Sequence, residues 1–282
     1  MPLTINTNTS SLNAQRLLGI NTNMLNRSME KLASGYRINR AGDDAAGLMI
    51  SETLRAQIRG SQKALDNTQD GINVLNIADG AMQTITDNIQ RIRELTVQAA
   101  NDTYATAQRS AIAVEIDALR ADIDRIANSV EFNGTSLLAA AGVPANFNIQ
   151  VGPNNVAAND TIDVITALGD TTTGAAGLNL TAASVATNAA ANVYLGVIDT
   201  SLAALNTQRA TLGSFSNRLE SAAANLGISI ENLSSSESRI RNVDIASESA
   251  KMTQSQILQQ ASATILSQAN QAPGLALKLL GG

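Results

Sequence analysis

The chain has 282 residues, of which 44% are hydrophobic but only 2% aromatic, and it contains no Cys and no His. The missing residue types exclude disulfide bridges, thiol nucleophiles, histidine bases and Cys/His zinc sites. A formal net charge of −5, from 19 basic and 24 acidic residues, argues against a nucleic-acid-binding protein, which would carry a basic surface.

A first helix is predicted over residues 10–32. Its apolar residues recur at steps of seven, four and three: Leu18, Leu25, Met29 and Leu32. This spacing is typical of a helix with one apolar face. The segment "SGYRINRAGDDAAG" (34–47) then interrupts the pattern with glycines. Asp43 and Asp44 are placed to cap the next helix, because carboxylates accept the free N–H groups of a helix N-terminus.

A very long helix is predicted from about Asp44 to Ala100. Its Leu, Ile and Met residues keep heptad-like steps of three, four and seven along this stretch, which indicates a coiled coil or a long bundle helix. A second helix is predicted over roughly 106–130. The sequence "EFNGTSLL" (131–138) ends it with an Asn-Gly pair, which is a turn signal.

The middle of the chain changes character. Residues 146–165, "NFNIQVGPNNVAANDTIDVI", alternate apolar and polar side chains around Gly-Pro-Asn-Asn, the pattern of a β-hairpin. Residues 166–184 are rich in Thr, Ala and Gly and predict a loop. No Lys or Arg occurs between Arg125 and Arg209, so this region is locally acidic.

Helical spacing returns after the acidic region, with apolar steps of three, four and seven from Ile198 to Leu233. We expect "SSSES" (234–238) to interrupt this helix. A final helix is predicted from about 240 to 271, ended by the Pro-Gly pair that follows.

The final helix is unusual because it is uncharged: no Asp, Glu, Lys or Arg occurs from Met252 through Leu277. Helices at opposite ends of the chain most simply pair with each other, because neither could bury its apolar stripe alone. The predicted fold class is therefore mainly α, a long antiparallel helical bundle or coiled coil with a small β-hairpin element in the middle of the chain.

Three stretches closely resemble the bacterial flagellins. "SSLNAQRLLGINTNMLNRSMEKLASGYRINRAGDDAAGLMISETLRAQIRG" (10–60) is similar to the N-terminal flagellin signature. "QRIRELTVQAAN" (90–101) resembles the flagellin segment that faces neighbouring subunits, and "NVDIASESAKMTQSQILQQASATILSQANQAPGLALKLL" (242–280) resembles the C-terminal helix. With their connecting helices, these regions make up roughly two-thirds of the chain.

The resemblance implies a filament subunit whose terminal helices pair as an inner tube (D0), inside a layer of further helices with a small β element (D1). It implies that both termini are disordered in the free subunit and fold during assembly. It also implies export of the unfolded chain through the flagellar type III channel, consistent with the lack of a recognisable cleavable signal peptide and of an 18-residue apolar span. The outer domains of larger flagellins, D2 and D3, are expected to be absent.

The resemblance divides the chain into five segments. These are a D0-like helix and spoke (1–43), D1-like helices (44–138), a short β-hairpin and loop segment where outer domains would insert (139–190), a C-terminal D1-like helix (191–237) and a C-terminal D0-like helix (238–282).

A second contact surface is expected on the long helix. Ile85, Ile89, Ile92 and Ala99 share one face, whereas Arg91, Leu95 and Gln98 lie on a flank about 80° or more away. The simpler alternative makes Leu95 the ordinary edge of the apolar stripe. In flagellins this surface packs against the next subunit and is bound by the vertebrate Toll-like receptor 5. The positions carried over from the resemblance are Ile89, Gln90, Arg91, Leu95 and Glu115, and the helical projection adds Gln98 to this surface.

Nine residues of the terminal helices are expected to serve filament-core assembly: Leu18, Leu25, Met29, Leu32, Leu258, Ala261, Ile265, Leu266 and Ala269. On a helical projection Leu258, Ala261, Ile265 and Ala269 form one stripe, and Leu266 belongs to a second. Two stripes suit a helix with neighbours on more than one side. The alternative is a weakly stable polar tail.

Arg37, Arg40, Asp43 and Asp44 are expected to form ion pairs between subunits in a filament, which salt and low pH would weaken. Adjacent aspartates after a glycine could also be read as a metal or phosphate site, but a turn and helix cap is the commoner role.

The functional hypothesis is a flagellin, a structural subunit of the flagellar filament with no enzymatic activity and no cofactor. The alternatives are a hook–filament junction protein or another secreted helical type III substrate. Expected partners are other flagellin subunits, the junction protein, the filament cap, the export apparatus with its flagellin chaperone, and Toll-like receptor 5, but no nucleic acid and no membrane. The expected location is extracellular, in the filament.

Overall fold

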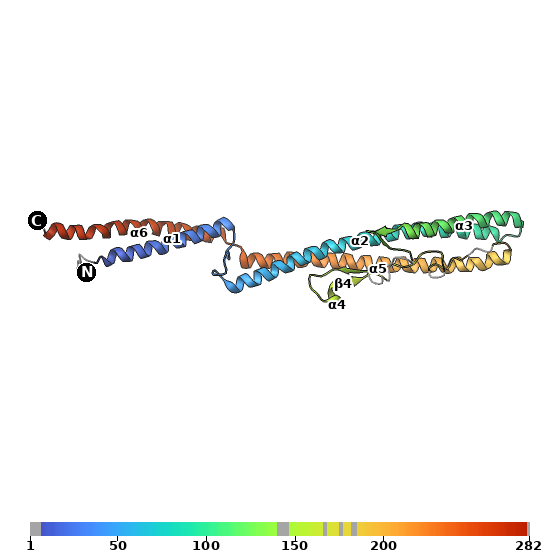
Figure 1. The fold of residues 1–282 in the computed structure, drawn as a ribbon, viewed down its shortest axis with the longest axis horizontal. Helices are drawn as coiled ribbons and strands as arrows, with labels where there is room; N and C mark the ends of the chain where they lie inside the picture. The colour runs from blue at the N-terminus through green and yellow to red at the C-terminus, as the bar shows by residue number, and fades with distance from the viewer. Residues whose placement is uncertain (1–6, 140–146, 166–167, 175–176, 182–184, 281–282) are drawn as a thin grey trace. The chain divides into compact units, whose positions relative to one another are not determined.

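The computed structural model describes residues 7–139, 147–165, 168–174, 177–181 and 185–280. The long helices are α1 (Thr9–Ser34), α2 (Ala45–Ala99), α3 (Thr106–Ser129), α5 (Asn188–Arg241) and α6 (Ile245–Leu280), and α4 (Ala157–Asp160) is a single turn (Figure 1). Two small antiparallel strand pairs lie between α3 and α5 in the sequence. The predicted fold class, mainly α with a small β element in mid-chain, is confirmed.

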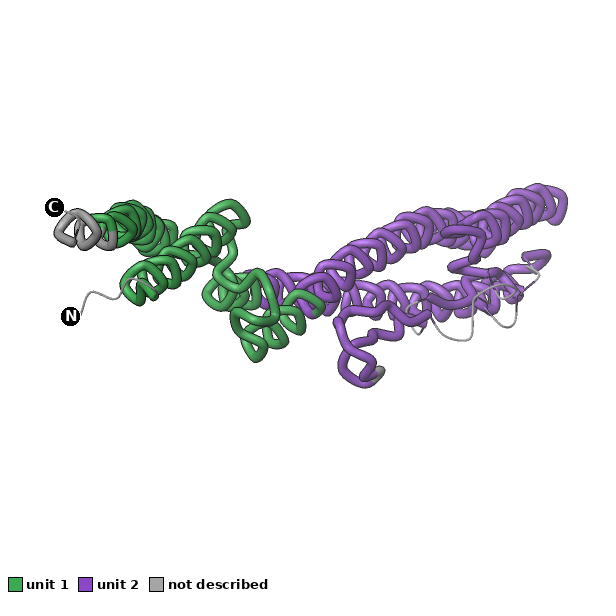
Figure 2. Tube along the Cα trace, turned by 60° about the vertical axis from the view of Figure 1, so that its left-hand side comes forward, with its two compact units in different colours: residues 1–56, 232–282 green, residues 57–231 purple. Residues whose placement is uncertain are grey.

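The chain forms two compact units (Figure 2). Unit 1 comprises residues 1–56 and 232–282, and unit 2 comprises residues 57–231. Helices α2 and α5 contribute residues to both units.

The core of unit 2 lies among α2, α3 and α5. Ile85, Ile89 and Ile92 of α2 are completely buried, and they belong to the same apolar cluster as Ile116 of α3 and Ile198 of α5. Because aliphatic side chains at steps of three and four share one side of a helix, three long helices can close a thin core with almost no aromatic residues.

Strands β1 (Glu131–Phe132) and β2 (Thr135–Ser136) pair antiparallel, with Phe132 opposite Thr135. Asn133 and Gly134 between them have φ values of 50° and 75°. Two successive left-handed residues are what a type I′ hairpin turn requires, and Asn-Gly supplies them at low cost. The turn expected from this pair is confirmed.

Strands β3 (Asn148–Gln150) and β4 (Thr161–Asp163) also pair antiparallel, with Ile149 opposite Ile162. The predicted hairpin is confirmed, but its connection is longer than a four-residue turn and contains α4. The reason is Asp160, whose buried carboxylate accepts the N–H of Val156 and holds this connection as a turn of helix.

Two glycines of α2 make room for this second hairpin. A Cβ added at Gly71 would lie 2.3 Å from Cδ1 of Ile149, and one at Gly60 would lie 2.9 Å from Cβ of Pro153. Glycine inside a helix costs about 1 kcal/mol relative to alanine, so its presence here fits a close approach of the hairpin to the helix.

In unit 1, α1 and α6 lie side by side and run antiparallel (Figures 1 and 2). Asn8 caps α1 by accepting the N–H of Ser11, and Asp244 caps α6 by accepting the N–H of Ala246. The expected pairing of the two terminal helices is present in the structure.

Two helix boundaries differ from the sequence prediction. Residues 234–238 do not interrupt α5, because a serine hydroxyl can bond within the helix, as Ser236 Oγ does to the carbonyl of Asn232. The Pro-Gly pair at 273–274 does not end α6, which continues to Leu280. Proline removes only one backbone donor, and the helix continues past it.

Candidate assembly surfaces

The exposed side of α2 and α3 carries a small ion-pair cluster around Arg91. Its guanidinium donates to Glu94 at 3.1 Å and to Glu115 of α3 at 3.0 Å. These hydrogen bonds, the one to Glu115 foremost, raise the pKa of Arg91 above its ordinary value. Gln98 donates to the hydroxyl of Tyr104 at 2.9 Å. The cluster presents polar and charged groups that a partner could contact.

Gln90 is exposed close to this cluster. It lines a shallow depression together with Arg93, Glu94 and Val97. Arg93 also pairs with Asp199 of α5 at 2.8 Å. Polar side chains of α2 therefore reach both neighbouring helices.

Ile89 and Leu95 do not lie on this surface. Leu95 is 3% exposed and Ile89 is fully buried, and both belong to the core. The expectation that Leu95 marks a second contact surface is wrong, and the stripe-edge alternative is correct. The physical reason is that α2 is covered by both α3 and α5, so its buried side is wider than a helix with one neighbour would have.

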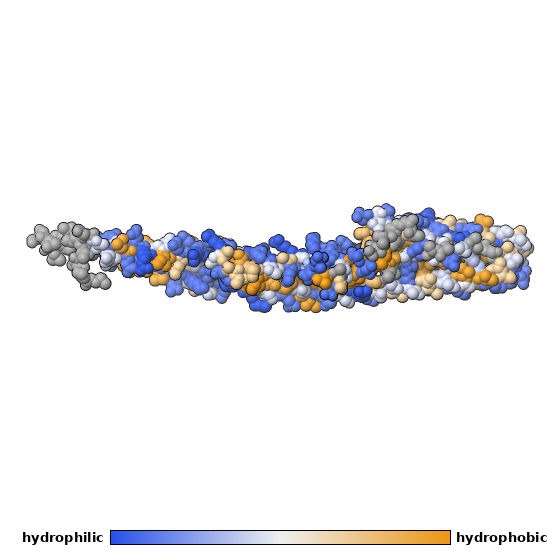
Figure 3. All heavy atoms as spheres, turned by 60° about the horizontal axis from the view of Figure 1, so that its bottom comes forward, coloured by the Kyte–Doolittle hydropathy of each residue, from blue (hydrophilic) through white to orange (hydrophobic). Residues whose placement is uncertain are grey.

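The nine expected assembly residues of the terminal helices fall into two groups that differ in burial. Leu18, Leu25, Leu32, Leu266 and Ala269 are half-buried, and Met29, Leu258, Ala261 and Ile265 are exposed. Leu258 and Ile265 are 42% and 56% exposed. Further exposed apolar side chains of this pair are Leu12, Leu17, Ile20, Met24 and Ile257. In Figure 3, orange apolar atoms are interspersed with blue polar ones on this pair.

A groove of 540 Å³ follows one face of the α1–α6 pair. Met24 of α1 and Leu258 of α6 both line it, with the cations Arg27, Lys31 and Lys251 around them. Residues three and four apart share a helix face, so Ile20 extends this apolar face along α1.

The charged residues of the loop between α1 and α2 form hydrogen bonds and an ion pair with other groups of the same chain. Asp44 caps α2 by accepting the N–H of Gly47 at 2.8 Å, which confirms its predicted cap. Asp43 instead closes the loop by accepting the N–H of Arg40, a bond that lowers the pKa of the Asp43 carboxyl. Arg40 pairs with Glu30 at 2.8 Å. Arg37 donates to the carbonyl of Ile240.

A cluster around Arg241 has no counterpart in the sequence prediction. The guanidinium of Arg241 lies 4.8 Å from the centre of the Tyr36 ring and forms an ion pair with Glu52. Beside it the backbone of Tyr36 pairs with that of Asn242. The pair of basic residues at the end of α5, Arg239 and Arg241, is the only sequence signal, because cations favour a helix C-terminus.

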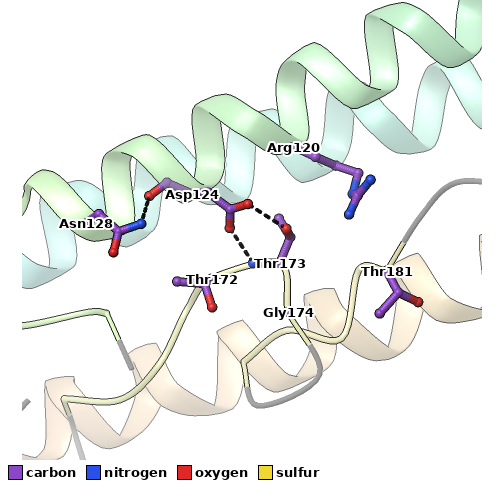
Figure 4. A pocket seen from close by; sticks show the side chains of 7 residues that line it. All are labelled: Arg120, Asp124, Asn128, Thr172, Thr173, Gly174 and Thr181. Atoms are coloured by element: carbon purple, nitrogen blue, oxygen red, sulfur yellow. Dashed lines mark hydrogen bonds between the residues drawn. The ribbon is translucent and has the colours of Figure 1, made fainter. Parts of the chain in front are cut away.

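A polar groove on unit 2 lies between α3 and the loop that follows β4 (Figure 4). Asp124 accepts both the N–H and the hydroxyl of Thr173, at 2.7 and 2.9 Å. Figure 4 shows Arg120 on the same helix beside this clamp. Its Nε donates to the carbonyl of Leu180. These contacts attach the loop to α3, and nothing in the residue spacing predicts them.

Among the described residues, no three His, Cys, Asp or Glu side chains are grouped so that they could hold a metal ion. Within the same residues, no helix is both long and apolar enough to cross a membrane.

Comparisons with known proteins assign the family. Residues 5–142 match the bacterial flagellin N-terminal helical region, and residues 195–280 match the bacterial flagellin C-terminal helical region. The chain is 42% identical over 272 residues to the flagellar filament 30.7 kDa core protein of Treponema maltophilum, covering 94% of this chain and 95% of the relative. The chain belongs to the bacterial flagellin family.

A second relative of this flagellin is the flagellin of Bacillus subtilis (strain 168), which is 42% identical over 302 residues and covers 98% of this chain and 99% of the relative. A solved structure titled a putative flagellar hook-associated protein, from Vibrio parahaemolyticus, matches with a TM-score of 0.59 over 71% of this chain and 100% of its own. Its identity of 13% shows a shared fold only. This flagellin is a short form without a central outer-domain region, and it is a structural subunit of the flagellar filament.

Proposed function

We propose that this flagellin polymerises with copies of itself, that its α1–α6 pair forms the inner layer of the filament, and that the outward apolar side chains of the pair contact neighbouring subunits. The observation that supports this proposal most directly is the exposure of Leu258 and Ile265 on a stretch of helix that has no charged residue from Met252 through Leu277. Water is a poor environment for such a face, and a neighbouring subunit would cover it.

Each apolar side chain that a neighbouring subunit covers contributes substantially to the free energy of assembly. Burying a Leu or Ile side chain contributes about 1.5–3 kcal/mol. Serine, threonine and glutamine around these residues can form hydrogen bonds across a contact without the high cost of burying a charge. A helix of this composition is stable when subunits cover it and weak when they do not, which is coupled folding and binding.

The Arg91 cluster is proposed as a second surface, for a neighbouring subunit and for Toll-like receptor 5. Four of the six predicted residues are exposed and can take part directly: Gln90, Arg91, Gln98 and Glu115. Ile89 and Leu95 would contribute only by holding α2 in place.

The loop residues Arg37, Arg40, Asp43 and Asp44 are proposed to form ion pairs between subunits in the filament. Their intrachain partners leave part of the hydrogen-bonding capacity of each side chain available, since a guanidinium has five N–H donors and a carboxylate accepts up to four bonds. Low pH and high salt would weaken such contacts.

The remaining proposals follow from family membership. The chain would be exported unfolded through the type III channel with a flagellin chaperone, and added to the filament under its cap beyond the junction protein, outside the cell. The five segments 1–43, 44–138, 139–190, 191–237 and 238–282 would be D0, D1, insertion site, D1 and D0. The chain would bind no cofactor, nucleic acid or membrane and would not be an enzyme.

Seeded polymerisation in salt, followed by sedimentation and negative-stain microscopy, tests the proposal. Ile265→Ala should weaken each subunit contact by about 2 kcal/mol and raise the critical concentration roughly thirtyfold. Ile265→Glu should abolish growth, because the carboxylate would be buried without a partner. Thr253→Ala, an exposed change on another side of α6, is the control and should grow like the parent.

Far-UV circular dichroism should show that the helices of unit 2 remain folded in all three variants. The proposal fails if the parent stays monomeric even with seeds, or if Ile265→Glu polymerises at the parent's critical concentration.

A further inference from the structure

The seam between α1 and α6 is polar where a helix pair usually carries its apolar residues. Ser255 and Ser262 of α6 and Ser28 of α1 are more than nine-tenths buried, and Gln259 lies half-buried between the two serines. The outward side of the same helix carries Leu258 and Ile265 instead. The most deeply buried side chains in the middle of this seam are therefore polar, and the large aliphatic ones beside them, such as Leu18 and Leu25, are only half-buried.

Hydrogen bonds link the polar side chains across the seam. Asn21 Nδ2 donates to Ser262 Oγ at 2.9 Å, and Gln259 Nε2 donates to Thr22 Oγ1 at 3.1 Å. Ser28 Oγ donates to the buried carboxylate of Glu248 at 2.7 Å.

Two further hydrogen bonds extend this series, which we call the ladder of polar pairs, toward the chain ends. Asn8 Nδ2 donates to the carbonyl of Ala269 at 2.7 Å, and Ser11 Oγ donates to Asn270 Oδ1 at 2.6 Å. From Ser11 to Ser28 along α1, the partners run in the opposite order along α6, from Asn270 to Glu248, so these pairs belong to one antiparallel register.

The other end of the seam is fixed by backbone. The N–H of Val243 donates to the carbonyl of Gly35 at 3.0 Å, and the N–H of Arg37 donates to the carbonyl of Arg241 at 2.7 Å. This bridge brings the end of α1 beside the start of α6 and aligns the first pair of the ladder.

The leucines of α1 cannot set the register by themselves. Leu18, Leu25 and Leu32 are seven residues apart, so a shift of two helical turns would bring one leucine to the place of the next. The pair of Thr22 and Gln259 does not tolerate that shift, which would place Thr22 opposite Leu266 in one direction or Met252 in the other and leave both side chains without their partners. The pair of Asn21 and Ser262 is less selective, because Asn21 would meet Ser255 in the second direction.

We propose that the register of α1 against α6 is determined by the backbone bridge at Tyr36 and Asn242 and by the ladder of polar pairs led by Thr22–Gln259, and that this register builds the apolar surface offered to a neighbouring subunit. A polar pair inside a coiled coil specifies alignment at a cost in stability. In the present register Met24 and Leu258 line the same groove. The inference rests on the proposed role of this pair as the inner layer.

Engineered cysteine pairs can read the register directly, because the chain has no cysteine of its own. Ser11→Cys with Asn270→Cys reports the native register, since these side chains are in hydrogen-bond contact. Ser11→Cys with Ala263→Cys reports a shift of seven residues. Both reporters lie far from the residues to be changed, and disulfide yields are measured in polymerising salt.

In the parent background the native reporter should form its disulfide and the shifted reporter should stay below about a tenth of that yield. Thr22→Leu with Gln259→Leu should raise the shifted yield about tenfold, because the leucine at position 22 would meet Met252 in the shifted register, and should reduce filament growth. The exchange Thr22→Gln with Gln259→Thr restores a donor and an acceptor and should restore the native pattern. Asn23→Leu with Ser267→Leu, a double-leucine change at exposed positions, should behave like the parent.

The inference is overturned if the double-leucine variant forms only the native disulfide and grows filaments like the parent, or if the exchange variant behaves like the double-leucine variant. Failure of the proposed function gives a different result. In that case the parent forms no filaments with seeds, while the native reporter still forms its disulfide in the soluble subunit.

Discussion

Replacing Leu95 by alanine distinguishes a core residue from a surface contact. The side chain is 3% exposed, so the change removes about 2.4 kcal/mol of transfer free energy for three carbon atoms. The cavity that remains adds about 1–2 kcal/mol. We therefore expect unit 2 to lose about 3.4–4.4 kcal/mol of unfolding free energy, whereas a surface leucine would cost less than about 0.5 kcal/mol.

Urea unfolding of the soluble subunit, followed by circular dichroism, measures this difference. With a denaturant slope of about 2 kcal/mol per molar urea, the midpoint should fall by about 1.7–2.2 M. Val97→Ala, two residues away and 50% exposed, is the matched control and should leave the midpoint within about 0.3 M of the parent. Equal midpoints for the two variants would refute the burial of Leu95. A confirmed loss would mean that reduced receptor signalling by Leu95→Ala reports weaker folding of α2.

Three further predictions concern other parts of the molecule. Gly80→Ala should raise the unfolding free energy of unit 2 by about 0.5–1 kcal/mol through helix propensity, because a Cβ there meets nothing within 4 Å. The same change at Gly71, beneath the second hairpin, should give no gain or a loss, and equal urea midpoints for the two variants would contradict the close approach of the hairpin. The hydrogen bond from Arg241 lowers the pKa of Glu52 below its ordinary 4.5. Because the folded-state pKa is the lower one, the stabilisation by Glu52 is present above pH 4.5 and is lost as pH falls through the folded-state value. Glu52→Gln should therefore differ from the parent in urea midpoint at pH 7 but not in strong acid, and a difference that persists in strong acid would count against the ion pair. Arg91→Ala should leave the urea midpoint close to that of the parent, because exposed ion pairs contribute little to stability, and a clear fall of the midpoint would mean that the cluster is structural.

Periodicity predicted the long helices and their pairing because apolar steps of three, four and seven are a property of the sequence alone. It could not predict the burial of Leu95. A helical projection gives the angle of a side chain, but the width of the buried side depends on how many helices cover it, and α2 is covered by α3 and α5.

For the same reason, the sequence could not predict which side of each terminal helix faces its partner helix and which side faces outward. Two apolar stripes were visible on the final helix, but their roles depend on where α1 lies. The structure places Leu266 and Ala269 toward the seam and Leu258, Ala261 and Ile265 outward. The polar pairs of the seam join residues more than 200 positions apart, and local pattern carries no information at that range.

The Arg241 cluster and the clamp of Asp124 on Thr173 were also invisible in the sequence. Each depends on segments that meet only after folding, and neither follows a spacing rule. The serine run at 234–238 was misleading for a different reason. Serine is a weak helix former, but its hydroxyl can bond to the preceding turn, so tertiary packing decides whether the helix continues.

The seam described for α1 and α6 lies entirely within one chain, and this has a consequence for filaments built from more than one gene product. Because each subunit satisfies its own buried polar groups, a neighbour does not need matching polar residues. It must match only the outward aliphatic side chains and the cations along the groove. Flagellins that differ widely along the seam could therefore copolymerise, whereas a single charged residue introduced on the outward face would exclude a subunit from the mixture.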